Sequence, residues 1–240
     1  MSFWGAAESH KLVLFDIDGT LLSAGRVARE SILVALERAY GWKAEPDHQD
    51  RRRYDFSGKT DPQIVRELVT DTVGRERCEE SLPRALDLYL EELERRLMPG
   101  TVVTKPGIPQ LLARLEAEPK VTLGLLTGNL ERGARIKLAP PGFNDYFPFG
   151  AFGSDSADRY DLPEVAVRRA RETTGRTFTG KSIVIVGDSI HDVACGRSLE
   201  VRTVAVATGP TKPEALAAQR PDALLPDFSD VDGAFEAILG

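Results

Sequence analysis

Short apolar runs alternate along the chain with stretches in which apolar residues recur every three or four positions. Continuous apolar runs are typical of strands covered on both faces, and the longer spacing is typical of amphipathic helices. The predicted strands are Lys11–Phe15, Val121–Leu126, Ser182–Val186, Arg202–Ala207 and the less strongly apolar Ala223–Leu225. The helices predicted between them are Gly107–Glu118, Leu130–Leu138, Pro163–Thr173 and Ile190–Leu199. Strands that alternate with helices predict an α/β fold with a parallel sheet.

The segment 22–99 departs from this alternation, because it shows helical periodicity and no convincing strand. Its predicted helices are Arg26–Tyr40, Asp61–Val73 and Arg84–Leu97. Asp61-Pro62 is a favourable pair for the N-cap and the first helical position. The polar stretch Ala44–Arg53 predicts a solvated connector, and Pro99-Gly100 marks the end of the segment. We therefore expect a helical insertion at 22–99 in an α/β core made of 1–21 and 100–240.

Composition narrows the classes of protein to consider. The chain has 240 residues, 42% of them hydrophobic, and a net charge of −6, so it can bury a sizeable core and lacks the basic excess typical of nucleic-acid or membrane-surface binding. Cys78 and Cys195 form no CxxC pattern, which favours two small buried thiols over a disulfide or zinc site. No apolar run reaches the ~18 residues of a membrane helix, and the first residues lack the pattern of a signal peptide. We expect a cytoplasmic protein.

Carboxylates follow two of the predicted strands. Asp16 and Asp18 come directly after the first strand, with Gly19 allowing a sharp turn. Asp188 and Asp192 follow the strand Ser182–Val186. In an open parallel sheet, ligands bind beyond the carboxyl ends of the strands. Carboxylates gathered there repel one another unless a cation lies between them, and Mg²⁺ prefers such oxygen ligands. The pattern predicts a divalent-metal site, although capping aspartates in turns would leave the same pattern.

A third strand end carries groups suited to binding an anion. Thr127 offers a hydroxyl, Gly128 allows close approach of the backbone and Asn129 offers an amide, directly before the predicted helix Leu130–Leu138. Backbone N–H groups at a helix start point toward an anion. A simple N-cap after a strand would use the same residues.

Together these motifs resemble a known family. The segments DIDGT at 16–20, LLTGN at 125–129 and GDSIHD at 187–192 are similar to motifs one, two and four of the haloacid dehalogenase superfamily, whose members are mostly Mg²⁺-dependent phosphatases. The helical segment 22–99 lies where that family carries its helical (C1) cap. The resemblance implies a Rossmann-like, three-layer core, and it is strongest to phosphoglycolate-phosphatase-like members.

The resemblance also implies roles for individual residues. Asp16 matches the nucleophile that forms an aspartyl phosphate, and Asp18 matches the general acid/base, which favours phosphoryl transfer because dehalogenating members lack this second acid. Asp16, the main-chain carbonyl of Asp18 and Asp188 match the Mg²⁺ ligands. Thr127, with Gly128 and Asn129 beside it, matches the residues that bind the phosphate. Asp192 matches an acid that supports the site.

This sequence departs from the family pattern at the third motif. The family usually places a Lys before the next helix to hold the phosphate, but the stretch 154–163 contains none. Arg159 is the favoured substitute and Lys137 is its rival, while either could instead be a solvated surface charge. In the GKTD stretch of the insertion, Lys59 is a candidate for binding the substrate anion, because related members close such a loop over the substrate.

The expected function is hydrolysis of a small, anionic phosphomonoester such as phosphoglycolate, with Mg²⁺ as cofactor and without nucleic-acid or membrane partners. Three alternatives stay open. A sugar phosphomutase such as β-phosphoglucomutase would use the same intermediate, and a phosphonate hydrolase would need Lys59 or Lys43 as a Schiff-base lysine. A non-catalytic binding module would not need Asp18. We expect His191 to face solvent and assign no role to His10 or His48.

Overall fold

The computed structural model describes residues 10–43, 55–98 and 100–240. The connector predicted at 44–53, His48 and the predicted boundary residue Pro99 lie outside these described residues.

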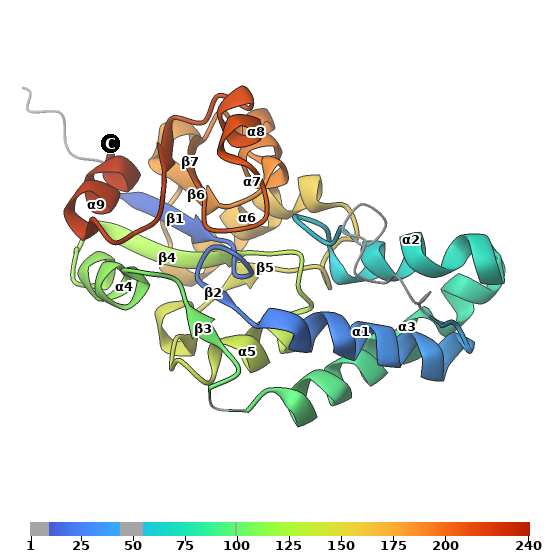
Figure 1. The fold of residues 1–240 in the computed structure, drawn as a ribbon. Helices are drawn as coiled ribbons and strands as arrows, with labels where there is room; N and C mark the ends of the chain where they lie inside the picture. The colour runs from blue at the N-terminus through green and yellow to red at the C-terminus, as the bar shows by residue number, and fades with distance from the viewer. Residues whose placement is uncertain (1–9, 44–54, 99) are drawn as a thin grey trace, which may run out of the picture.

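A parallel sheet forms the centre of the core (Figure 1). Its strand order is β5-β4-β1-β6-β7-β8, so β1 lies between β4 and β6, with Phe15 opposite Leu125 on one side and Val186 on the other. Because all pairings are parallel, the carboxyl ends of these strands lie at one edge. The strands are β1 Lys11–Phe15, β4 Val121–Leu126, β5 Gly150–Ala151, β6 Ile183–Gly187, β7 Arg202–Val206 and β8 Ala223–Leu225.

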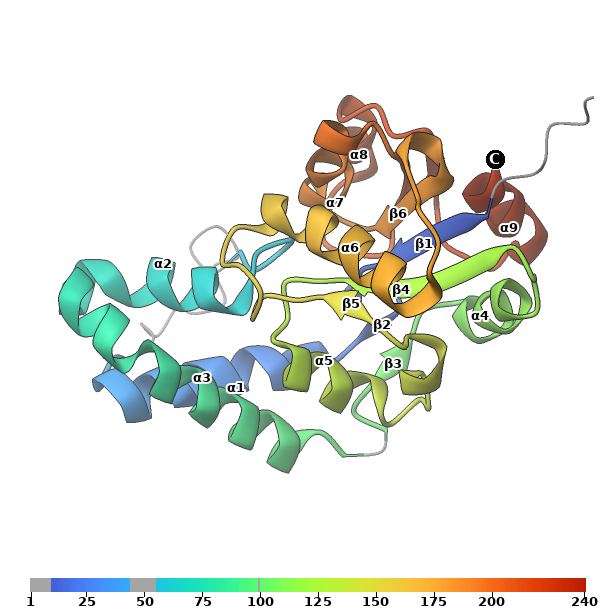
Figure 2. The same cartoon turned by 180° about the vertical axis from the view of Figure 1, so that it is seen from behind.

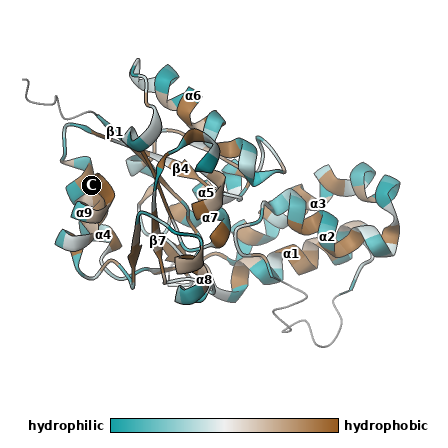
Figure 3. Ribbon diagram, turned by 90° about the horizontal axis from the view of Figure 1, so that it is seen from above, coloured by the Kyte–Doolittle hydropathy of each residue, from teal (hydrophilic) through white to brown (hydrophobic). Residues whose placement is uncertain are grey.

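Helices cover both faces of this sheet. Alternate side chains of β1 enter different clusters: Val13 and Phe15 pack with α4, α5 and α9, whereas Leu12 and Leu14 pack with α6 and α7. The strands are accordingly mostly apolar, with polar residues such as Lys11 and Arg202 at their starts, while the helices carry hydrophilic and hydrophobic stripes (Figure 3). The helices are α4 Ile108–Glu116, α5 Glu131–Leu138, α6 Leu162–Thr174, α7 Ile190–Cys195, α8 Pro213–Ala218 and α9 Val231–Leu239. The predicted three-layer α/β fold is confirmed.

Three further helices project from the carboxyl-end side of the sheet (Figure 2). They are α1 Gly25–Tyr40, α2 Asp61–Val73 and α3 Arg75–Arg96, and they share a hydrophobic cluster of their own. We call them the cap. A short antiparallel ribbon of β2 (Leu22–Ser23) and β3 (Val103–Thr104) lies where the chain passes between core and cap. None of the helices in the described ranges is long and apolar enough to cross a membrane.

Two details of the cap differ from the prediction. The N-cap of α2 is Thr60, whose hydroxyl accepts the Gln63 N–H, so Asp61 is the first helical residue. Helix α3 begins at Arg75 and continues through Pro83, which the predicted helix excluded. The reason is packing, because the buried stripe that includes Cys78 and Leu82 continues the apolar face of the helix on both sides of the proline.

Differences in the core are small. β1, β4 and β8 have the predicted bounds, and β6 is shifted by one residue. The helix predicted at Ile190–Leu199 is interrupted at Gly196, a poor helix former, and continues as a short 3₁₀ turn. The prediction omitted β2, β3, β5, α8 and α9 and the 3₁₀ turns Asn144–Tyr146, Arg159–Asp161 and Gly180–Ser182. Apart from α9, these elements are short or show no distinct periodicity of apolar residues along the sequence.

Candidate active site

Residues from three strand ends come together at the carboxyl edge of the sheet. The Asp16 N–H donates to the Val186 carbonyl at 3.0 Å, which continues the pairing of β1 with β6. The Thr127 N–H donates to the Ala151 carbonyl at 3.0 Å, which continues β4 beside β5. Because the backbone at both positions is held by the sheet, the side chains that follow the strands have fixed starting points.

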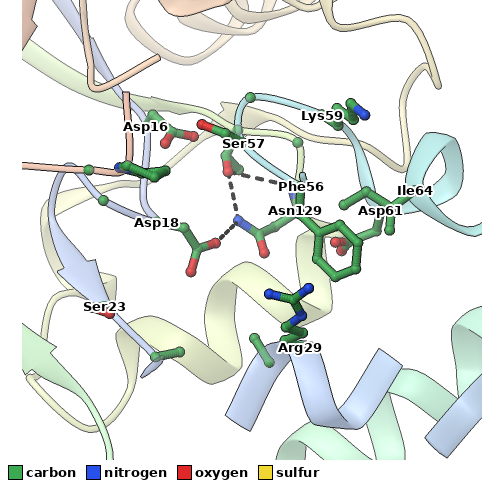
Figure 4. A pocket seen from close by; sticks show the side chains of 18 of the residues that line it. Asp16, Asp18, Ser23, Arg29, Phe56, Ser57, Lys59, Asp61, Ile64 and Asn129 are labelled. Atoms are coloured by element: carbon green, nitrogen blue, oxygen red, sulfur yellow. Dashed lines mark hydrogen bonds between the residues drawn. The ribbon is translucent and has the colours of Figure 1, made fainter. Parts of the chain in front are cut away.

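A cavity of about 620 Å³ lies between this edge and the cap (Figure 4). Its core wall includes Asp16, Asp18 and Thr127. The cap contributes Arg29 from α1, whose guanidinium lies 5.4 Å above the Phe56 ring and points toward the cavity in the close view. Its further lining includes Gly128, Asn129, Lys137, Arg159, Ser57, Lys59, Asp61 and Tyr89. The cavity therefore presents both carboxylates and cations to a ligand.

Asp18 is held by two core residues. Asn129 Nδ2 donates to Asp18 Oδ2 at 2.8 Å and to Thr127 Oγ1 at 2.8 Å. Lys137, a buried residue of α5, donates from Nζ to the same Asp18 oxygen at 2.6 Å and to Asn129 Oδ1. The side chain of Asp18 retains 41% exposure, so this anchored carboxylate still has an open side.

Arg159 occupies a different place beside Asp16. Only 3% exposed, its guanidinium contacts Asp16 Oδ1 at 3.1 Å and also pairs with Asp192. Burial alone lowers the pKa of Arg159, but the Asp192 and Asp16 carboxylates raise it above its ordinary value. Its Nε–H has no hydrogen-bond partner among the described residues. The two rival cations of the sequence thus both lie at the site, one on each carboxylate of the DIDGT motif.

Three buried carboxylates, including that of Asp16, gather around this arginine. One oxygen from each of Asp16, Asp188 and Asp192 lies within 4.8 Å of the others, and all three side chains are buried. Burial and then the Asp192 charge raise the pKa of Asp16 to about 7, against the opposing effect of Arg159. Burial and then the Asp16 charge raise the pKa of Asp188 well above its ordinary value.

This cluster suits a hard divalent cation, because carboxylate oxygens are its preferred ligands and the cation would remove the repulsion. Asp192 is already engaged: its carboxylate accepts from the Ser189 N–H and hydroxyl, in addition to the pair with Arg159. Asp16 and Asp188 are therefore the side chains best placed to hold such an ion. The side chain of Asp18 turns instead to Asn129 and Lys137.

Thr20 and Thr208, which had no role in the sequence reasoning, and Gly19, expected only to allow a sharp turn, also shape this cluster. The Thr20 hydroxyl donates to Asp188 Oδ1 at 3.1 Å, and the Thr208 hydroxyl donates to the Gly19 carbonyl at 2.6 Å. Gly19 has a φ of +93°, and a Cβ there would lie 2.4 Å from Asp188 Oδ2, so no other residue fits. Thr208 follows β7, and the rule on strand ends would have found it had it been applied to that strand.

Other candidates take less central places. Lys59 lines the cavity, but its ammonium pairs with Glu67 at 2.5 Å. His191, expected to face solvent, is half-buried with its ring 6.2 Å from that of Tyr160. His10 is not among the residues that line the cavity. Cys78 and Cys195 are both free and buried.

Asp188→Asn is expected to stabilise the metal-free protein by about 1–2 kcal/mol at pH 7. Asparagine keeps an oxygen for the Thr20 hydroxyl and removes one of the clustered charges. Because folding raises the pKa of Asp188, the wild type loses stability as the pH rises above the ordinary carboxyl range, and the variant lacks that loss. Urea unfolding in EDTA, at pH values from about 5 to about 8, measures the difference in the free energy of unfolding between the variant and the wild type.

Asp192→Asn is the matched control for that measurement. It removes one of the two carboxylate partners of the buried Arg159 guanidinium, so it should destabilise the protein by about 1–3 kcal/mol. Equal destabilisation by both variants would contradict the view that charge repulsion dominates at Asp188.

Comparison with known proteins agrees with this geometry. The family described as haloacid dehalogenase-like hydrolase matches residues 10–199. The "Probable phosphatase IndB" of Dickeya dadantii is 25% identical over 95% of this chain and 94% of its own length. A "Phosphoglycolate phosphatase" of Photorhabdus laumondii is 26% identical over 92% of this chain and 90% of its own.

A solved structure shares the fold. The crystal structure of a "predicted phosphoglycolate phosphatase" from Haemophilus somnus superposes with a TM-score of 0.71 at 18% identity, covering 96% of this chain and 99% of the other. The family match spans most of the chain and includes the three strand ends that build the site. This chain therefore belongs to the haloacid dehalogenase-like hydrolases.

Proposed function

We propose that this chain is a Mg²⁺-dependent phosphatase that hydrolyses a small phosphomonoester through an aspartyl-phosphate intermediate on Asp16. The observation that carries the proposal is the different surroundings of its two neighbouring carboxylates. Asp16 is buried against Arg159, whereas Asp18 is partly open and held by Asn129 and Lys137. Two carboxylates in unlike environments support two distinct roles, one as nucleophile and the other as acid and base.

In the first step, an oxygen of Asp16 attacks phosphorus, and the bond from phosphorus to the ester oxygen breaks. Asp18 gives a proton to the departing alkoxide, so the alcohol leaves neutral. The Lys137 ammonium, 2.6 Å from Asp18 Oδ2, stabilises the carboxylate that remains. In the second step Asp18 takes a proton from water as that water attacks phosphorus, and Asp16 and inorganic phosphate are released.

Several groups are placed to bind the phosphoryl oxygens in this mechanism. We assign that role to the Thr127 hydroxyl, to the backbone at Gly128 and Asn129 before α5, and to Arg159. The unpartnered Nε–H of Arg159 supports its part, because it leaves a donor of a buried cation for a substrate oxygen. Asp16, the Asp18 carbonyl and Asp188 would hold Mg²⁺, with Asp192 supporting Arg159. When bound, the metal neutralises negative charge on the transferring group.

The substrate that we favour is small and carries a second anionic group, with phosphoglycolate as the first candidate. The cavity of about 620 Å³ suits a small metabolite, and Arg29 and Lys59 line its cap wall. Relatives named phosphoglycolate phosphatase favour the same class. The two free, buried cysteines are compatible with the cytoplasm, which we propose as the location.

The test is phosphate release from a phosphonate and from a panel of phosphomonoesters that includes phosphoglycolate, a hexose phosphate and p-nitrophenyl phosphate, with Mg²⁺ or with EDTA. We expect turnover with Mg²⁺ and a loss of at least about 100-fold with EDTA. Phosphate transfer within a hexose phosphate, without net release, would establish a phosphomutase instead. Cleavage of a carbon–phosphorus bond alone would establish a phosphonate hydrolase, and no turnover on any compound would leave a binding module.

A further inference from the structure

A short loop of the cap is docked tightly onto the core beside the cavity. The Thr60 hydroxyl donates to the Ala157 carbonyl at 2.7 Å, and the Asp61 N–H donates to the Gly128 carbonyl at 2.8 Å. A Cβ on Gly128 would lie 2.1 Å from the Lys59 carbonyl oxygen, so only glycine allows the two backbones to come this close. Thr60 is fully buried, and Asp61 is 5% exposed. We call residues 59–61 the docking loop.

The carboxylate of Asp61 reaches beyond its own helix. It lies in the first turn of α2, yet Oδ2 accepts the N–H of Leu130 at 2.8 Å, and Leu130 is the residue that precedes α5. Leu130 itself offers no capping side chain to that helix. A cap residue therefore fixes the start of a core helix.

Helix α5 carries Lys137, the residue that holds Asp18. Lys137 bonds to Asp18, and the Asp61 carboxylate lines the same cavity and feels the Lys137 charge. Burial raises the pKa of Asp61 to about 6, while the Lys137 charge and the Leu130 N–H act in the opposite direction. Tyr89 of α3 lies in the same group, since burial and then the charges of Asp61 and Asp18 raise its pKa. The cap and the acid/base residue are thus linked through one electrostatic cluster.

We propose that Asp61 is a positioning residue, which holds the start of α5 and balances Lys137 so that Asp18 is correctly placed only while the docking loop is seated on the core. The inference rests on the proposed function, in which Asp18 is the acid and base. It gives the cap a role in catalysis that is separate from covering the substrate. It also explains why a carboxylate is buried at a helix start whose capping already comes from Thr60.

The test compares Asp61→Ala, Asp61→Asn and a control from the same loop, Thr60→Val. Asp61→Ala removes the Leu130 contact and the charge, so kcat should fall about 10-fold with KM changed by less than about 3-fold. Asp61→Asn keeps an oxygen for the Leu130 N–H and should recover about half of that loss on a logarithmic scale. Thr60→Val removes the bond to Ala157 but keeps the bonds of Asp61 to Gly128 and Leu130, so the loop stays seated and kcat should change by less than about 3-fold.

Hydrogen exchange gives a readout that needs no turnover. The Leu130 amide should exchange at least about 10-fold faster in Asp61→Ala than in Thr60→Val, because only the first variant removes its acceptor. In a double-mutant cycle with Lys137→Met, the effects of Asp61→Ala on kcat should not multiply, because both residues act on Asp18 through one cluster.

Two results would overturn the inference. One is an equal change of kcat and KM in Asp61→Ala and Thr60→Val, which would reduce Asp61 to simple docking. The other is a fully multiplicative cycle with Lys137→Met. Both presuppose an active wild type; if the wild type hydrolyses no phosphomonoester, the proposed function fails, and the positioning of Asp18 for that reaction fails with it. The exchange rate of Leu130 then still reports whether Asp61 fixes the start of α5.

Discussion

Asp16→Asn is expected to lower turnover by at least about 10³-fold while the protein remains folded. An amide oxygen is a poor nucleophile toward phosphorus, so no covalent intermediate forms. The structure of the site should survive, because the asparagine oxygen can still accept from Arg159, which lies 3.1 Å from Asp16 Oδ1. The measurement is kcat with Mg²⁺ on the best ester of the panel, with a thermal melt to confirm folding.

Asp18→Asn is the matched control, because it keeps the nucleophile and removes the acid and base. With p-nitrophenyl phosphate, whose leaving group needs little protonation, the first step should still proceed and the second should stall. Acid quenching followed by intact-mass measurement should then show phosphate on the Asp18→Asn protein and none on Asp16→Asn. A phosphorylated Asp16→Asn protein would contradict the assignment of the nucleophile.

Much of the site could be predicted from sequence because it depends on topology. Once strands β1, β4 and β6 are parallel neighbours, the residues that follow them must meet at one edge, whatever the details of packing. Asp16, Thr127 and Asp188 follow from that argument alone. The fold class follows in the same way from apolar strands that alternate with amphipathic helices.

The partners of these residues could not be predicted, because they depend on the reach of side chains. Arg159 and Lys137 were rivals for one role, yet a 3₁₀ turn brings the first to Asp16 and a helix brings the second to Asp18. Asp61 was assigned to its own helix by a local rule, but its carboxylate bonds to Leu130, 69 positions away along the chain. Local capping rules cannot show such a contact.

The same distinction explains the error at α3. The predicted helix began directly after Pro83, and proline is a local signal that interrupts most helices. In the structure the apolar face of α3 continues through this position, with Cys78 and Ala85 both fully buried in the cap core. Packing against the cap core outweighs the local preference, as tertiary contacts often do.

Arg159→Met is expected to destabilise the protein by about 3–5 kcal/mol at neutral pH and to abolish turnover. The guanidinium lies between Asp16 and Asp192, and methionine would fill its volume but leave both buried carboxylates without their cation. Arg159→Lys should lose less stability than Arg159→Met, because the ammonium keeps the positive charge. Some loss should remain, because a single ammonium cannot match the planar donor set of arginine. Urea unfolding in EDTA compares the variants.

Lys137→Met provides the contrast within the same site. Its partner Asp18 is 41% exposed, so water can solvate that carboxylate when the ammonium is removed, and the expected loss is about 1–2 kcal/mol. An equal loss in both variants would show that the burial of Asp16 and Asp192 does not set the energetic difference between the two cations.

The pH dependence of Arg159→Met tests the cause of its instability. In the wild type, burial and the Asp192 charge already raise the pKa of Asp16 to about 7, against the opposing effect of Arg159. Without that cation the pKa of Asp16 rises further, so the folded variant binds protons more tightly than its unfolded chain does. Its stability should therefore recover as the pH falls from about 8 to about 6. A loss that stays constant over this range would point to lost packing, whereas recovery would show that Arg159 keeps the proposed nucleophile ionised in a buried site.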